Sequence, residues 1–189
     1  MNNLVSHELV LRNRGSVRVL IDRESADVAS GFLVGVPSDD MLVRIQSRCL
    51  YGEVLGSVDC DCRDQLDASL DQIFAEECGL IIYLEQEGRG SGLLSKALAY
   101  ALKASDGLDT FAAYEHLGIP RDERDYADAA ALLGDLNVSR VRLLTNNPRK
   151  IAALESAGIG VTRVPAVSPV VHQRAVDYLA AKKASGHLL

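Results

Sequence analysis

The sequence predicts an α+β fold with mixed β-sheets, an N-terminal antiparallel meander and flanking helices. Residues 1–45 contain short β-rich runs separated by turn signals, and the second half alternates strand patterns with amphipathic helix patterns. The chain has 189 residues, of which 48% are hydrophobic, and shows no repeat or linker. We therefore expect one domain over residues 1–189.

Four short runs near the N-terminus have the composition of β-strands. They cover residues 9–11, 17–21, 32–36 and 41–45. Asn13-Arg14-Gly15, an acidic turn and the segment 37–40 separate them. Strands that follow one another through short turns usually pair side by side, so we expect an antiparallel meander here.

A helix is expected after these runs. Apolar residues repeat from Leu66 to Phe74 at the spacing of one helical face. Asp64 is the expected cap of its start and Gly79 the expected cap of its end. The continuous apolar run over residues 80–84 then fits a buried strand.

The rest of the chain alternates helices with strands, which implies parallel pairing through crossover connections. Residues 93–103 are an expected helix, residues 106–121 a connection, and residues 141–144 and 161–164 strands. Asp122 is expected to open a helix that runs through Leu133. A last helix begins with Asn147 as N-cap and Pro148 at its first position, and it ends at Gly158.

Composition and charge exclude several classes of protein. The net charge of -6 argues against a general nucleic-acid binder, which is normally basic. No stretch approaches the roughly 18 apolar residues of a membrane span, and the first residues show no secretory signal. We therefore expect a cytoplasmic protein that has no nucleic-acid or membrane partner and keeps its thiols reduced.

Three of the four cysteines, Cys49, Cys60 and Cys62, fall within fourteen residues. We expect Cys49 to return to the other two across a hairpin that contains Gly52, so that three thiolates could bind zinc. The helix between carries Cys78 roughly 20 Å away at about 1.5 Å per residue, which leaves it an ordinary buried thiol. A count of three ligands favours an open, catalytic zinc site. The alternative is three small buried hydrophobic residues at a chance spacing.

Three further segments stand out by their charged or glycine-rich composition, and two of them could bind an anion. Residues 87–92 form a glycine-rich loop before a helix, which could approach a phosphate or could be a flexible turn with a solvated Arg89. Residues 122–125 carry mixed charges, which suit the first turn of a solvated helix. Residues 145–150 place a hydroxyl, two amides and two cations at a helix start, where they could bind an anion or cap the helix.

Taken together, these segments resemble GTP cyclohydrolase II, the zinc enzyme at the entry to riboflavin biosynthesis. The resemblance is carried by residues 44–49, Cys60-Asp61-Cys62 with Gln65-Leu66, residues 86–89 with 92–94, Asp109-Thr110, residues 122–126, residues 143–150 and the ending 186–189. The matching segments run in order from about residue 41 to the end. The resemblance implies a GTP cyclohydrolase II-like fold.

The family opens the imidazole ring of GTP, expels C8 as formate and releases pyrophosphate, giving 2,5-diamino-6-(5-phosphoribosylamino)pyrimidin-4-one. The resemblance implies zinc on Cys49, Cys60 and Cys62, magnesium on the triphosphate, and a homodimer. It gives Tyr100 a role in proton transfer and Arg124, with Asp122 as proton acceptor, a role at the α-phosphorus. It implies nucleotide contacts for Arg44, Ser47, Arg48, Gln65, Glu87, Gly88, Arg89, Thr110, Thr145 and Lys150.

The sequence departs from the family's usual pattern around this expected pocket. Gln46 and Arg48 stand where the family usually has His and Glu, and Arg63 follows the third cysteine in place of Gly. Ala112-Ala113-Tyr114 replaces a usual Glu-Ala-Asn. These changes leave two alternatives open beside the GTP reaction. One is a paralogue that acts on another purine nucleotide or gives a different product, and the other is a nucleotide-binding protein without turnover.

Overall fold

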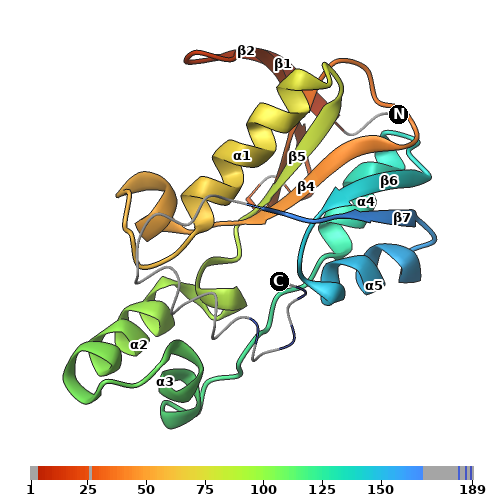
Figure 1. Ribbon diagram of the computed structural model, residues 1–189. Coiled ribbons are helices and arrows are strands. Elements are labelled where there is room, and N and C mark those ends of the chain that lie inside the picture. Colours follow the sequence, from red (N-terminus) through yellow and green to blue (C-terminus); the bar gives the residue numbers. More distant parts are fainter. Residues whose placement is uncertain (1–3, 26, 168–182, 184–185, 187, 189) are drawn as a thin grey trace.

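The computed structural model describes residues 4–25, 27–167, 183, 186 and 188, and Figure 1 shows a mixed β-sheet with helices packed around it. Seven strands are hydrogen-bonded in the order β1-β2-β3-β5-β4-β6-β7. They are β1 (Leu4–Leu11), β2 (Gly15–Asp22), β3 (Ala29–Val34), β4 (Met41–Ser47), β5 (Gly79–Leu84), β6 (Arg140–Leu144) and β7 (Gly160–Val164). The α+β class is therefore confirmed.

The N-terminal meander is confirmed for three strands and is wrong for the fourth. Strands β1, β2 and β3 pair antiparallel in chain order, and β3 then pairs antiparallel with β5. Strand β4 lies between β5 and β6 and is parallel to both. The chain leaves β4, forms a helix and returns as β5, and such a crossover connection brings the next strand back in the same direction.

Five α-helices and two short helical turns connect the described strands. They are α1 (Cys62–Ala75), α2 (Gly92–Asp106), α3 (Thr110–His116), α4 (Ala127–Asp135), α5 (Pro148–Ser156), the π-helical turn η1 (Leu50–Val54) and the 3-10 turn η2 (Glu87–Gly90). Helix α1 starts earlier than expected, with Asp61 at the N-cap position. Gly79 begins β5, where a Cβ atom would lie 2.6 Å from the carbonyl oxygen of Leu42.

The segment before α4 differs most from the expectation. The expected connection over residues 106–121 contains α3, whose first turn donates two backbone N–H groups to the Asp109 side chain. The helix expected from Asp122 begins only at Ala127, where the Asp125 carboxylate accepts the backbone N–H of Ala127 at 2.7 Å. Asp122 therefore lies in a loop ahead of the helix.

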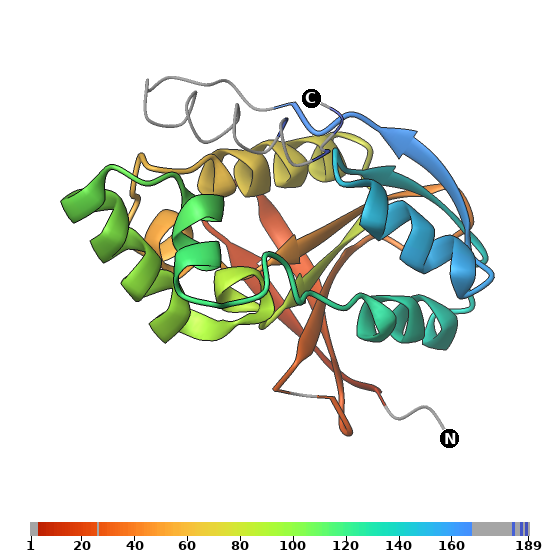
Figure 2. The same cartoon turned by 90° about the horizontal axis from the view of Figure 1, so that it is seen from below.

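Helices cover both faces of the sheet. On one face α1 packs against β2, β4 and β5 through Leu66, Leu70, Ile73 and Phe74. On the other face Leu133 of α4 and Leu154 of α5 belong to one apolar cluster with Ile45 and Ile82. Figure 2 shows these two helices side by side from below. Helices α2 and α3 form a separate small apolar cluster and lie together below the sheet in Figure 1. None of the helices in the described part of the chain is long and apolar enough to cross a membrane.

The family-like ending over residues 186–189 lies partly outside the described residues, because His187 and Leu189 are not described. Leu188 is described. Its backbone N–H donates to the carbonyl oxygen of Asn146 at 2.8 Å, and its own carbonyl accepts from Arg163 at 2.7 Å. The end of the chain thus contacts the turn between β6 and α5.

Candidate functional site

The expected site residues gather where the parallel strands end. Strand β4 ends at Ser47, β5 at Leu84 and β6 at Leu144, and their carboxyl ends meet at one edge of the sheet. In open α/β sheets this edge is the usual place for a ligand. The chain leaves β4 toward the cysteines, β5 toward the glycine-rich loop and β6 toward the turn before α5.

The three cysteines form one cluster. Their sulfur atoms all lie within 4.8 Å of one another, and the Cys49 and Cys60 sulfurs are 3.7 Å apart. Cys49 and Cys60 are buried, whereas Cys62 is half-buried at the start of α1. The expected hairpin is wrong: the π-helical turn η1 follows Cys49 directly and brings the chain back in one turn.

Gly52, inside η1, leaves room for this cluster. A Cβ atom at Gly52 would lie 2.9 Å from the Cys60 sulfur and 3.3 Å from the Cys49 sulfur. The backbone N–H of Gly52 donates to the Cys49 sulfur at 3.4 Å. Three convergent thiols are donors that suit a soft metal ion such as zinc, so the donor set and the space around it fit the expected ion.

The cluster already favours one thiolate. Hydrogen bonds from the Cys60 and Cys62 thiols, together with the charge of Lys96, hold the pKa of the Cys49 thiol far below its usual value. The interaction with Cys49 raises the pKa of Cys60 to about 11. Metal binding requires deprotonated thiols, so an incoming ion would meet a preformed thiolate at Cys49 and release protons from the other two.

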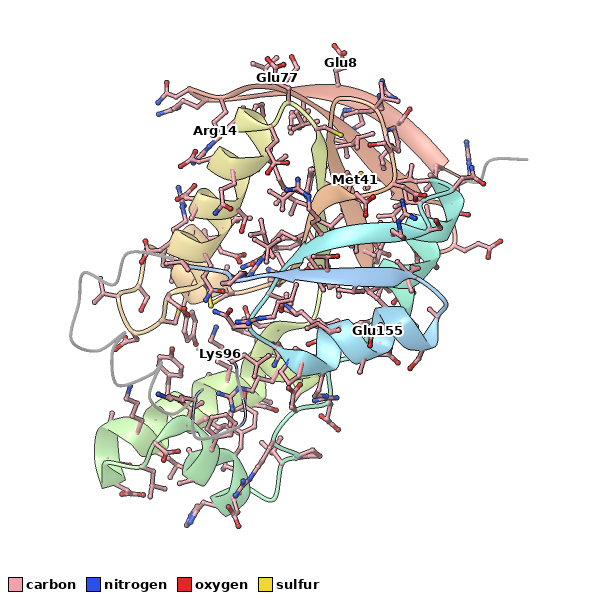
Figure 3. All side chains as sticks on the ribbon, turned by 45° about the vertical axis from the view of Figure 1, so that its right-hand side comes forward. Glu8, Arg14, Met41, Glu77, Lys96 and Glu155 are labelled. Carbon is pink, nitrogen blue, oxygen red and sulfur yellow. The ribbon has the colours of Figure 1, made fainter. Side chains whose placement is uncertain are left out.

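Lys96 of α2 is a buried cation beside the cluster. Its Nζ lies 3.2 Å from the Cys49 sulfur and 2.8 Å from Glu87 Oε1. Figure 3 shows Lys96 extending from α2 into the region between that helix and the sheet. Glu87 Oε2 in turn accepts the backbone N–H of Leu50 at 2.7 Å. Lys96 and Glu87 therefore connect the glycine-rich loop to the cysteine cluster.

The glycine-rich loop is held in a left-handed conformation. Gly88 and Arg89 have φ of 60° and 59°, a region that costs energy for a residue with a side chain. The Arg89 guanidinium lies 3.7 Å from the ring centroid of Phe111. The Tyr114 hydroxyl donates to the Gly88 carbonyl at 3.0 Å. These contacts hold Arg89 against Phe111, which speaks against the alternative of a solvated arginine.

A second loop carries Asp122 and Arg124. The Arg124 guanidinium donates to both carboxylate oxygens of Asp122, at 2.9 and 2.7 Å. Arg149 of α5 adds an ion pair to Asp122 at 2.9 Å. Burial raises the pKa of Asp122, but the Arg124 hydrogen bonds and charge outweigh it and hold this pKa below its usual value. The mixed charges of residues 122–125 thus form a fixed pair in place of a solvated first helical turn.

One pocket brings most of the expected residues together. Of the residues expected at the site, Ser47, Arg48, Cys49, Cys60, Cys62, Glu87, Gly88, Arg89, Tyr100, Thr110 and Arg124 line it. Tyr100 packs edge-on against Tyr51, with ring centroids 5.2 Å apart. Asp122 reaches the pocket through its pair with Arg124.

Four expected nucleotide contacts do not line this pocket: Arg44, Gln65, Thr145 and Lys150. Arg44 is buried against Gln46, Gln65 and the Leu144 carbonyl. Thr145 Oγ1 accepts the backbone N–H of Asn147 inside the turn before α5, and Lys150 Nζ donates to the Ile45 carbonyl at 2.7 Å. Asn147 caps α5 through the Arg149 N–H, as expected.

Two pocket residues were not identified as site residues from the sequence: Gln86 and Lys96. Tyr114 also lines the pocket, where it was expected as a departure from the family pattern. Lys96 lies four residues before Tyr100, so the two share a face of α2, and this spacing could have indicated it. Gln86 Nε2 donates to the Asp125 carbonyl at 2.7 Å and so ties the two loops together.

The pocket also has unsatisfied polar atoms. Within the described residues, three buried side-chain atoms have no hydrogen-bond partner: Ser47 Oγ, Gln86 Oε1 and Arg89 Nη1. All three residues line this pocket. Buried polar groups are nearly always paired, so unpaired atoms that converge on one pocket indicate a polar ligand.

Comparisons with known proteins show which sequences this chain resembles. The sequence model of the GTP cyclohydrolase II family matches residues 8–165. The chain is 50% identical over 153 residues to riboflavin biosynthesis protein RibBA of Bacillus mycoides (strain KBAB4). It is 49% identical over 153 residues to the protein of the same name from Bacillus cytotoxicus (strain DSM 22905 / CIP 110041 / 391-98 / NVH 391-98). Both matches cover 80% of this chain and only 38% of the relative.

Proposed function

Because the chain belongs to the GTP cyclohydrolase II family, we propose that it opens the imidazole ring of GTP and releases formate and pyrophosphate. The pyrimidine product is then 2,5-diamino-6-(5-phosphoribosylamino)pyrimidin-4-one. One observation carries this proposal: three thiols within 4.8 Å of one another line the same pocket as Tyr100 and Arg124. The three thiols and the fixed guanidinium of Arg124 would then face the same bound nucleotide.

Cys49, Cys60 and Cys62 are the proposed zinc ligands. Among the described residues, this cluster contains no fourth His, Cys, Asp or Glu, so a zinc ion here would keep an open coordination position. Bound there, zinc supplies a Lewis acid that activates water for attack on C8 of the purine. Lys96 and the Gly52 N–H stabilise the charge on the Cys49 thiolate.

The chain's own residues handle the proton and the phosphates. The Tyr100 phenol lines the pocket and can pass a proton to an imidazole nitrogen of the base. Arg124 is fixed by Asp122, and a guanidinium in this position stabilises charge on the α-phosphoryl group. An attack by Arg124 on the α-phosphorus, with Asp122 accepting the proton, uses the same pair but is demanding because arginine is normally always charged.

Ser47, Arg48, Glu87, Gly88, Arg89 and Thr110 are the proposed nucleotide contacts, since they line the pocket. We propose Mg²⁺ as the ion that accompanies the triphosphate, because carboxylate and phosphate oxygens are its preferred ligands. A cytoplasmic compartment suits the four free cysteines, which need a reducing environment. We also propose that residues 1–189 form one domain and assemble as a homodimer.

A second candidate is a paralogue that opens another purine nucleotide. Arg48 forms an ion pair with Glu85 at 2.7 Å at the pocket wall, and Tyr114 fills the space beside Gly88. Both residues depart from the family pattern. They change the charge and shape of the pocket where the nucleotide would lie.

The test is incubation of zinc-loaded protein with GTP and Mg²⁺, with formate, pyrophosphate and the pyrimidine followed together. All three products in equal amounts are expected. Ring opening of another purine nucleotide in the absence of any product from GTP would favour the paralogue. Bound GTP that is returned unchanged would identify a binding protein without turnover.

A further inference from the structure

Outside the pocket, a chain of hydrogen-bonded polar side chains connects the segment that carries Cys49 with the segment that carries Cys60 and Cys62. At its centre, the Arg44 guanidinium donates to Gln46 Oε1 at 2.8 Å and to Gln65 Oε1 at 2.7 Å. Gln65 Nε2 donates to the Asp61 carboxylate at 2.5 Å, and Gln46 Nε2 donates to the Glu53 carboxylate at 2.6 Å. The two glutamines therefore have the same orientation, with oxygen toward the cation and nitrogen toward an anion.

Each end of this chain reaches the proposed zinc ligands. Asp61 lies between Cys60 and Cys62 and is 1% exposed. At the other end, Glu53 Oε2 accepts the backbone N–H of Cys49 at 3.2 Å. The Tyr83 hydroxyl donates to the same Glu53 oxygen at 2.5 Å. The segments that carry Cys49 and the Cys60/Cys62 pair are thus joined through side chains of β4, α1 and η1.

The charges explain why a cation lies at the centre. Three thiolates around one Zn²⁺ leave a net negative charge, and a buried negative charge is costly without a counterion. Arg44 is 5% exposed and does not line the pocket. Its positive charge faces Asp61 and Glu53 through the two amides, and it also lies in the field of Cys62.

We propose that Arg44, Gln46 and Gln65 are positioning residues of the metal centre, which fix the three cysteines relative to one another and balance their charge. This inference rests on the proposed zinc site and gives Arg44 and Gln65 a role other than nucleotide binding. A glutamine suits both amide positions because its side chain accepts from a guanidinium and donates to a carboxylate at once. Partners of this kind behind a metal site typically change metal affinity by about 10- to 100-fold.

The test uses three isosteric glutamine variants, one of them a control, together with Arg44→Lys. Gln65→Glu and Gln46→Glu keep the oxygen toward Arg44 but place a second carboxylate against Asp61 or Glu53. Gln72→Glu makes the same charge change on an exposed position of α1 and is the matched control. Gln65 is only half-buried, so its variant is expected to fold even where the Gln46 variant does not. Arg44→Lys keeps the charge but loses the two-pronged donor geometry.

Zinc affinity is measured by competition with a chromophoric chelator, and the cobalt-loaded proteins are compared by absorption spectroscopy. We expect zinc to bind about 10- to 100-fold more weakly to Gln65→Glu and Arg44→Lys, with a changed thiolate-to-cobalt spectrum and little change in the KM for GTP. Gln72→Glu should match the wild type. A higher KM with unchanged zinc affinity and spectrum would overturn the inference and make these residues nucleotide contacts. A wild-type protein that binds neither metal would overturn both this inference and the proposed zinc site.

Discussion

Gly52→Ala tests the packing of the cysteine cluster most sharply, because the added methyl group would enter the space between the sulfurs. Its carbon would lie 2.9 Å from the Cys60 sulfur and 3.3 Å from the Cys49 sulfur and the Cys62 Cβ. Overpacking of this kind costs about 1–3 kcal/mol. At about 1.4 kcal/mol per tenfold change, zinc should bind roughly 5- to 150-fold more weakly.

The zinc-free protein should tolerate the same change, since Gly52 lies in a helical turn and unbound thiols can rotate away from the methyl group. Alanine is also favoured over glycine in helices by about 1 kcal/mol. Gly134→Ala is the matched control, because it lies in α4 and a Cβ atom there meets no atom within 4 Å. Chelator competition on both variants gives the comparison. A Gly52→Ala protein that binds zinc within about twofold of the Gly134→Ala protein would refute the packing argument.

Three further outcomes follow from the loops around the pocket and from the proposed assembly. Asp122→Asn should destabilise the protein at pH 7 by about 1–3 kcal/mol in urea unfolding, because the Arg124 ion pair is lost. The pKa of Asp122 is lowered in the folded protein, so its stabilisation is present above the unfolded pKa of about 3.9 and is lost as the pH falls through the folded pKa. If the stability difference between wild type and Asp122→Asn were as large at pH 2 as at pH 7, the lowered pKa of Asp122 would be contradicted. Gly90→Ala should lower the Tm more than Gly92→Ala. Both glycines have positive φ, but only a Cβ atom at Gly90 would lie 2.8 Å from the Glu123 backbone. Equal decreases in Tm would exclude that contact. Light scattering should give about twice the 20.4 kDa of one chain, and a value for the single chain would contradict the homodimer.

The cysteine spacing predicted which thiols would meet, and the structure brings those three together. It did not predict how the chain returns, since a hairpin and a tight helical turn both fit a segment with Gly52 and Gly56. In the structure Gly52 of η1 lies against the sulfurs, where a Cβ atom would come within 2.9 Å of the Cys60 sulfur. The short-range pattern therefore identified the three cysteines that meet and missed the backbone that positions them.

The predicted helix start at Asp122 was wrong for a different reason. A run of acidic residues in the sequence resembles a first helical turn, but Asp122 forms ion pairs with Arg124 and with Arg149 of α5. The Asp125 carboxylate then accepts the backbone N–H of Ala127, the first residue of α4. Long-range ion pairs of this kind cannot be seen in the local pattern, and here they decide where α4 begins.

Strand β4 shows the same limit at the level of topology. Its composition is that of the preceding strands, which suggested a fourth meander strand. The helix that follows it was predicted, and a strand-helix-strand order already favours a parallel crossover. The burial of Lys96 and Gln46 could not be predicted, because a buried lysine and a buried glutamine have the sequence appearance of ordinary surface residues.

The most direct test of the proposed function is the release of formate from GTP as zinc is titrated back into zinc-free protein. We expect no formate without metal, a linear rise with added zinc and a plateau at about one equivalent per chain. The Cys60→Ser protein should release none at any zinc concentration. Formate release by zinc-free protein, or undiminished release by Cys60→Ser, would contradict the assignment of this cluster as the catalytic metal centre.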